Sequence, residues 1–332
     1  MRRRQLIAFG ASTALATPGW LRAQPRRPFD LQAHRGGRGL WPENTLAAFE
    51  RALRLGVSTL EMDTGVTADG VVVVHHDRLL NPALARDAQG RYLTRADLPL
   101  HALRWEELQA WDVGRRDPGA AYGREFNATQ QAIDGQRIPR LAEVFALVRR
   151  LGADAVQFDI ETKLDPTRPD DTLAPEPFAE ALLAELRGHE MLARTMVQSF
   201  DWRTLRHLQR LAPGLRRMFL TMDLPQQSNV RDGRWTDGHR LEDHGGSVPR
   251  LVRAAAGDTP GVLWGVIHRQ LTPAQVQEAQ ALGLSVVPWT VNEPARMAEL
   301  IGWGVDGLIT DYPDRLRTVM AAHGLPLPPG AT

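Results

Sequence analysis

The stretch QFDIETK at residues 157–163 decides the fold class of this chain. Apolar and ionisable residues alternate in it, which is the period of two typical of a β-strand. Asp159, Glu161 and Lys163 therefore share one face of the strand. Lys163 is the only lysine among the 40 lysine and arginine residues of the chain, which points to a role that arginine does not fill. The alternative is an exposed strand face with ordinary ion pairs.

Further short apolar runs alternate with helical patterns, which is typical of a parallel α/β sheet. Eight core strands are predicted near residues 29–34, 57–63, 155–161, 195–200, 216–220, 263–268, 284–290 and 306–310. Helices are predicted between them at 44–55, 141–151, 177–187, 202–211, 273–282 and 294–301. Eight such strands indicate an α/β protein with a closed (β/α)8 TIM barrel, in which the chemistry lies at the C-terminal strand ends.

One polar stretch, from about residue 78 to 136, does not fit this repeat. A short extra strand at 71–75 precedes it and is expected to pair with the second core strand through a tight turn. A loop of this length inside a compact domain usually has a function. We expect one barrel domain over residues 24–332, with an insertion after the second strand that covers the barrel mouth.

The N-terminus has the pattern of an export signal. Arginines at positions 2–4 precede an apolar run at 6–16, and a small residue follows at Ala23. The run is shorter than the roughly 20 apolar residues of a membrane-spanning helix, and residues 3–7 resemble a twin-arginine signal. We expect cleavage after Ala23 and a periplasmic or secreted protein with no transmembrane segment, by either the Sec or the Tat route.

The charge and the cysteine content exclude several function classes. Cleavage after residue 23 would remove four arginines and change the formal net charge from +1 to −3. Nucleic-acid binding needs a clustered cationic excess, so no nucleic-acid partner is expected. The chain has no cysteine, and therefore no disulfide, thiolate nucleophile or lipoprotein attachment site.

The predicted C-terminal strand ends carry an unusually polar set of side chains. Glu61 and Asp63 are two residues apart on one strand and point the same way, as do Glu161 and Lys163 on another. Carboxylates on neighbouring strands repel one another unless a cation lies among them, and an oxygen-only set suits Mg²⁺ or Ca²⁺ rather than zinc. The alternative is pairing of these carboxylates with the abundant arginines.

Two histidines, His34 and His76, are expected at the same mouth from different strands. Such a pair suits a general base and a general acid, although a hydrogen-bonded core histidine is the alternative for each one alone. His75 alternates with His76 and should point away from the site. His268 and Asp77 are secondary candidates for support or substrate contact.

Six segments, taken in order, resemble the glycerophosphodiester phosphodiesterase family. Each is short, but the ordered set is specific. They are AHRGGRGLWPENTLAAF (33–49), EMDTGVTADGVVVVHHD (61–77), FDIETK (158–163), VQSF (197–200), PWTVN (288–292) and DGLITDYPD (306–314).

The resemblance implies a (β/α)8 barrel that hydrolyses small glycerophosphodiesters, such as glycerophosphocholine, to glycerol 3-phosphate and an alcohol. It also implies one bound divalent cation, Ca²⁺ or Mg²⁺, and three groups of site residues. These are the metal ligands Glu61, Asp63 and Glu161, the acid/base pair His34 and His76, and the substrate-binding residues Arg35, Lys163 and Trp289.

Some positions of the resemblance concern support rather than chemistry. Glu43 and Asn44 are expected to brace the loop after the first strand, and Asn44 to cap the next helix. Thr162 departs from the apolar or small residue often found there, and the segment after Asp77 is longer than in minimal members. The compact ammonium of Lys163 would bind one phosphate oxygen without the planar fork of an arginine.

Two other functions stay open. A lysophospholipase D-like phosphodiesterase of the same barrel would need apolar surface for an acyl chain, which the polarity of residues 78–136 disfavours. A catalytically inactive binding protein would lack a histidine or a carboxylate, and none is missing. The head group, the metal ion and a cyclic phosphate intermediate formed by the glycerol 2-hydroxyl also stay open.

Overall fold

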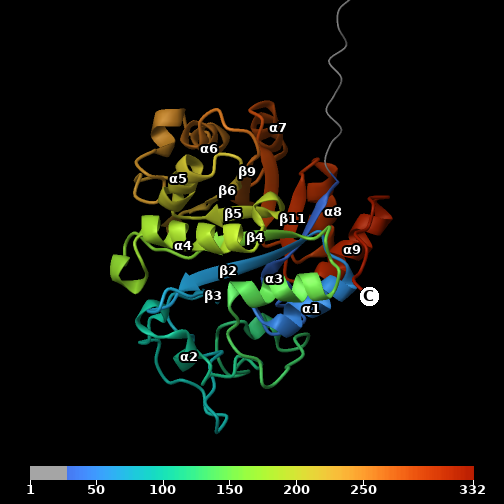
Figure 1. Ribbon diagram of the computed structural model, residues 1–332. Helices are drawn as coiled ribbons and strands as arrows, with labels where there is room; N and C mark the ends of the chain where they lie inside the picture. Colours follow the sequence, from blue (N-terminus) through green and yellow to red (C-terminus); the bar gives the residue numbers. More distant parts are fainter. Residues whose placement is uncertain (1–27) are drawn as a thin grey trace, which may run out of the picture.

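Eight parallel strands form a nearly closed TIM barrel in the computed structural model, which describes residues 28–332 (Figure 1). The strands are β1 (Asp30–Ala33), β2 (Thr59–Val66), β4 (Gln157–Thr162), β5 (Thr195–Ser199), β6 (Arg216–Thr221), β9 (Val262–Ile267), β10 (Ser285–Trp289) and β11 (Gly307–Thr310). All eight predicted strands are confirmed, with ends that shift by three residues or fewer.

Each strand pairs with its neighbours in chain order, from β1 through β10, and β11 pairs with β1. Backbone hydrogen bonds join β10 and β11 across the remaining gap. The N–H of Asp306 donates to the carbonyl of Val286, and the N–H of Val291 donates to the carbonyl of Ile309, each at 2.9 Å. These two bonds bring the ends of the sheet together, and the barrel is nearly closed at its last pair of strands.

Helices surround the strands (Figure 1). They are α1 (Leu46–Leu55), α3 (Leu141–Arg150), α4 (Pro175–Gly188), α5 (Trp202–Leu211), α6 (Val248–Ala256), α7 (Pro273–Ala281), α8 (Pro294–Gly302) and α9 (Pro313–Ala322). The six predicted helices are confirmed, and α6 and α9 complete the set. The predicted cap of α1 is wrong, because Thr45 rather than Asn44 accepts the hydrogen bond from Ala48 N at 3.2 Å.

The core has two layers because side chains alternate along each strand. Outward-facing residues such as Phe158 and Ile160 pack beneath the helices. A separate apolar cluster contains residues of β5, β6, β9, β10 and β11: Met196, Met218, Leu220, Leu263, Val287 and Ile309. On β2 and β4 the corresponding face instead carries carboxylates, which are Glu61 and Asp63 on β2 and Asp159 and Glu161 on β4. The inward face of these two strands is therefore charged.

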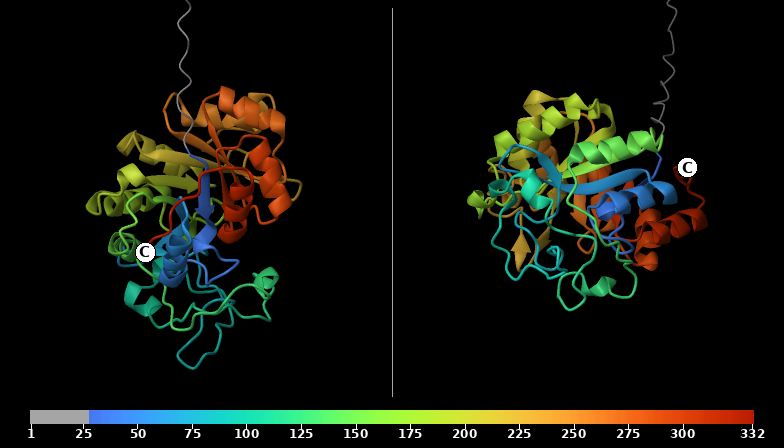
Figure 2. Two further views of the ribbon diagram at one scale, coloured as in Figure 1. Left: turned by 90° about the vertical axis from the view of Figure 1, so that its right-hand side faces the viewer. Right: turned by 60° about the horizontal axis from the view of Figure 1, so that its bottom comes forward.

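A segment without long helices or strands follows β3 (Val72–Val74), which pairs with β2 in the antiparallel sense as predicted. It contains one short helix, α2 (Trp105–Leu108). In Figure 2 the segment, drawn in cyan to green, lies along one side of the barrel. The segment has a small apolar cluster separate from the barrel core. Leu80, Leu100 and Leu108 pack there with Val73 and Ile138, which flank the segment in the sequence.

The remaining elements are short. A hairpin of β7 (Asp223–Leu224) and β8 (Gln227–Ser228) follows β6. The 3-10 turns are η1 (His34–Gly36), η2 (Leu100–Ala102), η3 (Arg124–Phe126), η4 (Pro169–Asp171), η5 (Leu192–Arg194) and η6 (Leu241–His244). The predicted export signal at residues 1–23 lies outside the described residues, and between residues 28 and 332 no helix has the length and apolar character to span a membrane.

Candidate active site

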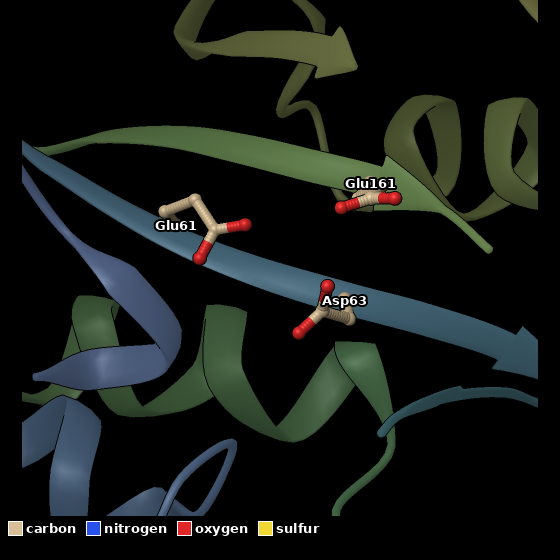
Figure 3. A group of neighbouring side chains, drawn as sticks. All are labelled: Glu61, Asp63 and Glu161. Carbon is tan, nitrogen blue, oxygen red and sulfur yellow. The ribbon is translucent and has the colours of Figure 1, made fainter. Parts of the chain in front are cut away.

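Three buried carboxylates meet on neighbouring strands, with Glu61 and Asp63 within β2 and Glu161 near the C-terminal end of β4. The two strands pair in parallel, and this pairing places Asp63 directly beside Glu161. Glu61 lies on the same face of β2 as Asp63, and the three side chains extend into one space (Figure 3). One oxygen from each carboxylate lies within 4.8 Å of the others. The structure therefore brings together all three residues that the sequence predicts as metal ligands.

The three carboxyl groups have very different proton affinities. Burial would raise the pKa of Asp63, but the positive charge of Arg35, followed by other nearby cations, holds it well below its ordinary value. Burial raises the pKa of Glu61 well above its ordinary value, and the charge of Asp63 adds to this effect. Burial raises the pKa of Glu161 to about 7, against the opposing charge of Lys163. A divalent cation would offset this mutual repulsion.

The donor set fits a hard metal ion. All three groups offer oxygen, and all three are buried. The Oδ1 atom of Asp63 is buried and has no hydrogen-bond donor in the described part of the chain. Its nearest cation, Lys163 Nζ, is 3.6 Å away, which is too far for a hydrogen bond, and coordination to a metal ion would satisfy this buried oxygen. The cluster can hold a metal ion.

Lys163 lies between this cluster and His76. Its Nζ is 2.9 Å from Glu161 Oε1, 3.6 Å from Asp63 Oδ1 and 3.0 Å from His76 Nε2. Burial would lower the pKa of Lys163, but the charges of Glu161 and Asp63 raise it, so the side chain is an ammonium. Because an ammonium only donates, His76 Nε2 accepts through its lone pair.

The other ring nitrogen of His76 contacts a carboxylate. Nδ1 lies 2.8 Å from Asp77 Oδ1, and Asp77 Oδ2 accepts from Asn81 Nδ2 at 2.6 Å. Nδ1 therefore carries the proton of the neutral ring. Burial lowers the pKa of His76 to about 4, and the charges of Arg35 and Lys163 add to the shift. Asp77, a secondary candidate from the sequence, thus holds the ring of His76.

His34 is held in the same way on the other side of the cluster. Its Nδ1 lies 2.5 Å from Asp311 Oδ1, and Asp311 also accepts from Arg38 Nε at 2.9 Å and Asn292 Nδ2 at 2.7 Å. Its Nε2 lies 4.0 Å from Glu61 Oε2. Burial lowers the pKa of His34, while the charge of Asp311 partly opposes the shift. Sequence reasoning assigned no role to Asp311 or Asn292, although both lie in segments that resemble the family, at residues 306–314 and 288–292.

Arg35 occupies an unusual backbone conformation in the turn after β1. Its φ is 52°, in the left-handed region that few non-glycine residues adopt. Its backbone N–H donates to Glu61 Oε2 at 2.8 Å, and its Nε lies 3.0 Å from Asp63 Oδ2. Gly36 follows with φ 81°, and a Cβ there would lie 2.9 Å from that of Ala48. The turn thus directs both the backbone and the side chain of Arg35 toward the carboxylates.

Further residues support the acidic cluster. Asn44 Nδ2 donates to Asp63 Oδ2 at 2.9 Å, and its backbone N–H donates to the carbonyl of Arg35 at 3.0 Å. Asn44 therefore braces the loop, as predicted. Gln198 Nε2 donates to Glu61 Oε1 at 2.7 Å, a contact that sequence reasoning missed because a glutamine on a strand gives no distinctive signal.

A cavity of about 220 Å³ opens at these strand ends. One part of its wall is charged and includes both histidines, Arg35, Glu61, Glu161 and Lys163. The other part is apolar and includes Phe200, Leu220, Trp289 and Ile309. The rings of Phe200 and Trp289 meet edge to face, with centroids 5.3 Å apart. His75 and His268 do not line this cavity.

An oxygen-only acidic cluster that could hold a metal ion, two histidines and a lysine at the mouth of a TIM barrel are groups that suit a hydrolase. The chain belongs to the glycerophosphoryl diester phosphodiesterase family, whose family match covers residues 34–315. The predicted enzyme class is confirmed: the chain is a phosphoric diester hydrolase that acts on glycerophosphodiesters.

Known proteins resemble the chain over most of its length. The glycerophosphodiester phosphodiesterase of Bacillus subtilis (strain 168) is 27% identical over 300 residues, which are 88% of this chain and 86% of that protein. A solved structure of a glycerophosphoryl diester phosphodiesterase from Silicibacter pomeroyi DSS-3 is 37% identical, with a TM-score of 0.79. The match covers 92% of this chain and 97% of that chain.

A more distant structure supports the fold. It is the phosphodiesterase of Oleispira antarctica in complex with the product sn-glycerol-3-phosphate. It is 22% identical, with a TM-score of 0.61, and the match covers 89% of this chain and 97% of that one.

Proposed function

We propose that this enzyme releases glycerol 3-phosphate and an alcohol by general acid–base catalysis at a metal site, with the residue roles that the family resemblance implies. The observation that carries the proposal is the placement of two histidine Nε2 atoms beside one acidic cluster. Each ring is tied through Nδ1 to a carboxylate, which is the buried Asp311 for His34 and the partly exposed Asp77 for His76. Each Nε2 is therefore directed at the site, where a proton can be taken up or given.

Glu61, Asp63 and Glu161 would hold one divalent cation, Ca²⁺ or Mg²⁺. The support is the set of buried oxygen donors within 4.8 Å of one another. When bound, such an ion polarises a phosphate oxygen and offsets charge that develops on it. The ionised cluster would also keep the ammonium of Lys163 in place.

Arg35 and Lys163 would bind the substrate phosphate. Both line the cavity, and both are fixed by buried carboxylates, Arg35 by Asp63 and Lys163 by Glu161. Charged donors that are already oriented stabilise the developing negative charge at phosphorus without reorganisation. Lysine suits its position because its compact charge lies only 2.9 Å from Glu161 and 3.0 Å from His76.

His34 would act as the base that activates the attacking hydroxyl, from water or from the glycerol 2-position, and His76 as the acid. The neutral state of His34 leaves Nε2 free to accept a proton, and Asp311 would stabilise the resulting imidazolium. The charges of Arg35 and Lys163 lower the pKa of His76. An incoming phosphate anion would neutralise these charges and raise that pKa, so that His76 Nε2 can carry the proton for the leaving alcohol.

Trp289 would contact the alcohol portion of the substrate, because it lies in the apolar wall opposite the charged residues. The segment at residues 78–136 would limit access to the site from the side of β1. Its Gln131 N–H donates to the carbonyl of Leu40 at 2.8 Å, and Gln130 Nε2 donates to the carbonyl of Arg38 at 2.7 Å. These contacts fasten the segment to the loop that carries Arg35.

We also propose that the protein is exported after cleavage near Ala23. The support is the sequence pattern alone: three arginines, an apolar run and a small residue. N-terminal sequencing of protein from periplasmic and culture fractions tests it. A chain found in the cytoplasm with an intact N-terminus would contradict the proposal.

Comparison of two substrates tests the proposed reaction. Glycerophosphocholine and lysophosphatidylcholine are supplied to the chelator-treated enzyme with and without Ca²⁺ or Mg²⁺, and glycerol 3-phosphate and choline are measured. We expect metal-dependent release of both products from glycerophosphocholine. Faster choline release from lysophosphatidylcholine would favour the lysophospholipase D alternative, and no hydrolysis of any diester with any metal ion would favour a binding protein.

A further inference from the structure

Tyr122 brings the segment at residues 78–136 into contact with the proposed phosphate-binding residue Arg35. Its hydroxyl accepts a hydrogen bond from Arg35 Nη1 at 2.9 Å and donates one to Glu43 Oε1 at 2.6 Å. Arg35 Nη1 also donates to the same Glu43 oxygen at 2.8 Å. The three groups form a closed triangle of hydrogen bonds.

This triangle determines which part of the Arg35 guanidinium remains available. Nε lies 3.0 Å from Asp63 Oδ2, and Nη1 is bound by Glu43 and Tyr122. Among the described residues 28–332, Nη2 takes part in no hydrogen bond, and Arg35 lines the cavity. Two of the three guanidinium nitrogens are thus held by the protein, and the third is left for a ligand.

The hydroxyl of Tyr122 stays protonated and can therefore donate its hydrogen bond to Glu43. Burial, followed by the charge of Glu43, raises its pKa well above the ordinary value, so the proton stays on oxygen. Glu43 is ionised, because the charges of Arg35 and Arg38 outweigh the effect of burial and hold its pKa below the ordinary value. Hydrogen bonds to an ionised group are shorter and stronger than neutral ones.

The local backbone fixes the position of Tyr122. Arg116 Nη1 donates to the carbonyl of Tyr122 at 3.3 Å. Gly123 follows with φ 66°, and a Cβ there would lie 2.7 Å from the Cδ of Arg116. The ring of Phe126 in the next turn lies 4.9 Å from the guanidinium carbon of Arg38. The loop is therefore packed against the turn that carries Arg35.

We propose that Tyr122 is a positioning residue that orients the Arg35 guanidinium so that Nη2 faces the substrate phosphate. The inference rests on the proposed phosphate-binding role of Arg35. A long arginine side chain loses considerable rotamer entropy when a ligand fixes it, and a side chain that is already fixed loses less. The segment would then contribute to phosphate affinity and not only to access.

Removal of one hydroxyl group tests this role. Tyr122→Phe keeps the ring and removes only the hydroxyl, and the affinity of the metal-loaded enzyme for glycerol 3-phosphate is measured by calorimetry. We expect affinity to fall roughly 5- to 20-fold, less than the full effect of a hydrogen bond to a charged group, because Glu43 still binds Nη1. KM for glycerophosphocholine should rise by a similar factor, with a smaller change in kcat. A purely structural role would lower Tm without this split.

Tyr92→Phe is a matched control in the same segment. The Tyr92 hydroxyl donates to the carbonyl of Arg115 at 3.2 Å, outside the proposed site. Its loss should leave ligand affinity and KM unchanged. Equal losses in Tyr92→Phe and Tyr122→Phe would overturn the proposal. Glu43→Gln is a second variant of the triangle, and it should weaken glycerol 3-phosphate binding in the same direction as Tyr122→Phe.

A double-mutant cycle separates the positioning role of Tyr122 from the phosphate-binding role of Arg35. In the Arg35→Lys background, Tyr122→Phe should have almost no further effect on affinity, because the group that Tyr122 positions is gone. Additive losses would overturn the positioning role. Weakened binding in Arg35→Lys but not in Tyr122→Phe would overturn that role alone. Unchanged affinity in Arg35→Lys would overturn the phosphate-binding role of Arg35, and the inference with it.

Discussion

The ends of β1, β2 and β4 supply the charged half of the barrel mouth, whereas the ends of β5, β6 and β10 supply Phe200, Leu220 and Trp289. Side chains of the charged half are each held by several ion pairs and hydrogen bonds. The apolar half is held by packing, as in the edge-to-face contact of Phe200 and Trp289. The difference suits two separate roles under the proposed function: the charged half would act on the phosphate, and the apolar half would contact the alcohol.

The largest expected effect is loss of the metal ion. Chelation should abolish hydrolysis, and Asp63→Asn should weaken metal binding strongly because it removes the lowest-pKa carboxylate of the cluster. Calorimetric titration of Ca²⁺ and Mg²⁺ measures the affinity. Asp154→Asn, which changes an 87% exposed carboxylate, is the control and should bind metal normally. Full turnover by protein shown to be metal-free would contradict the assignment of the charged half.

The next effect separates the two histidines by leaving group. His76→Ala should lose on the order of 10²–10⁴ in kcat/KM on glycerophosphocholine, a range typical of general acid catalysis. It should lose far less on a glycerol nitrophenyl phosphodiester, because nitrophenolate leaves without a proton. His34→Ala should be impaired on both substrates. Kinetics on both substrates, with circular dichroism and metal content as checks, provide the measurement.

His323→Ala is the control for this pair, because His323 is exposed near the C-terminal end of the chain. It should behave as the wild type on both substrates. Recovery of His34→Ala on the nitrophenyl ester would reverse the two roles. Equal losses of both variants on both substrates would mean that neither histidine protonates the leaving group.

A loss of similar or smaller size is expected at the only lysine. Lys163→Ala should lower kcat/KM by roughly 10² or more, because an oriented charge that stabilises the transition state is removed. Lys163→Arg should also be impaired, since the planar guanidinium does not fit a position 2.9 Å from Glu161 and 3.0 Å from His76. In the metal-loaded protein, Tm should change little. Unfolding of Lys163→Ala with normal specific activity would assign the lysine a structural role.

The sequence predicts the strands and the carboxylates of the charged half because both are local patterns. Because side chains alternate along a strand, Glu61 and Asp63 lie on the same face of one strand, independently of the rest of the fold. The prediction of Asn44 as a helix cap is wrong because Thr45 beside it is an equally suitable cap, and only the fold directs Asn44 to Asp63. Local chemistry cannot decide between two adjacent capping residues.

Contacts between distant parts of the chain were not predictable. His34 meets Asp311 from 277 residues away, and Tyr122 meets Glu43 across 79 residues. Neither pair leaves a periodic signal, because both depend on closure of the barrel and on the path of the segment at residues 78–136. The apolar half is similarly hidden, since Leu220 and Ile309 on strands read as ordinary core residues.

The smallest effect is expected in the apolar half. Phe200→Ala removes one ring of the aromatic pair and leaves every charged contact in place. A half-buried aromatic side chain contributes mainly through the apolar area it covers, so KM for glycerophosphocholine should rise only roughly 3- to 10-fold. Because the ring would contact the alcohol and not the phosphate, kcat should stay within about twofold and the affinity for glycerol 3-phosphate should be unchanged.

Variation of the alcohol sharpens this last prediction. With a methyl ester of glycerol 3-phosphate as substrate, little of the apolar wall is covered, and Phe200→Ala should match the wild type in KM. Leu211→Ala is the control, because Leu211 is a 40% exposed residue at the end of α5. A loss of glycerol 3-phosphate affinity in Phe200→Ala would mean that the apolar half also shapes the phosphate site. The two halves of the mouth would then act as one unit, and the division between phosphate and alcohol contacts would be wrong.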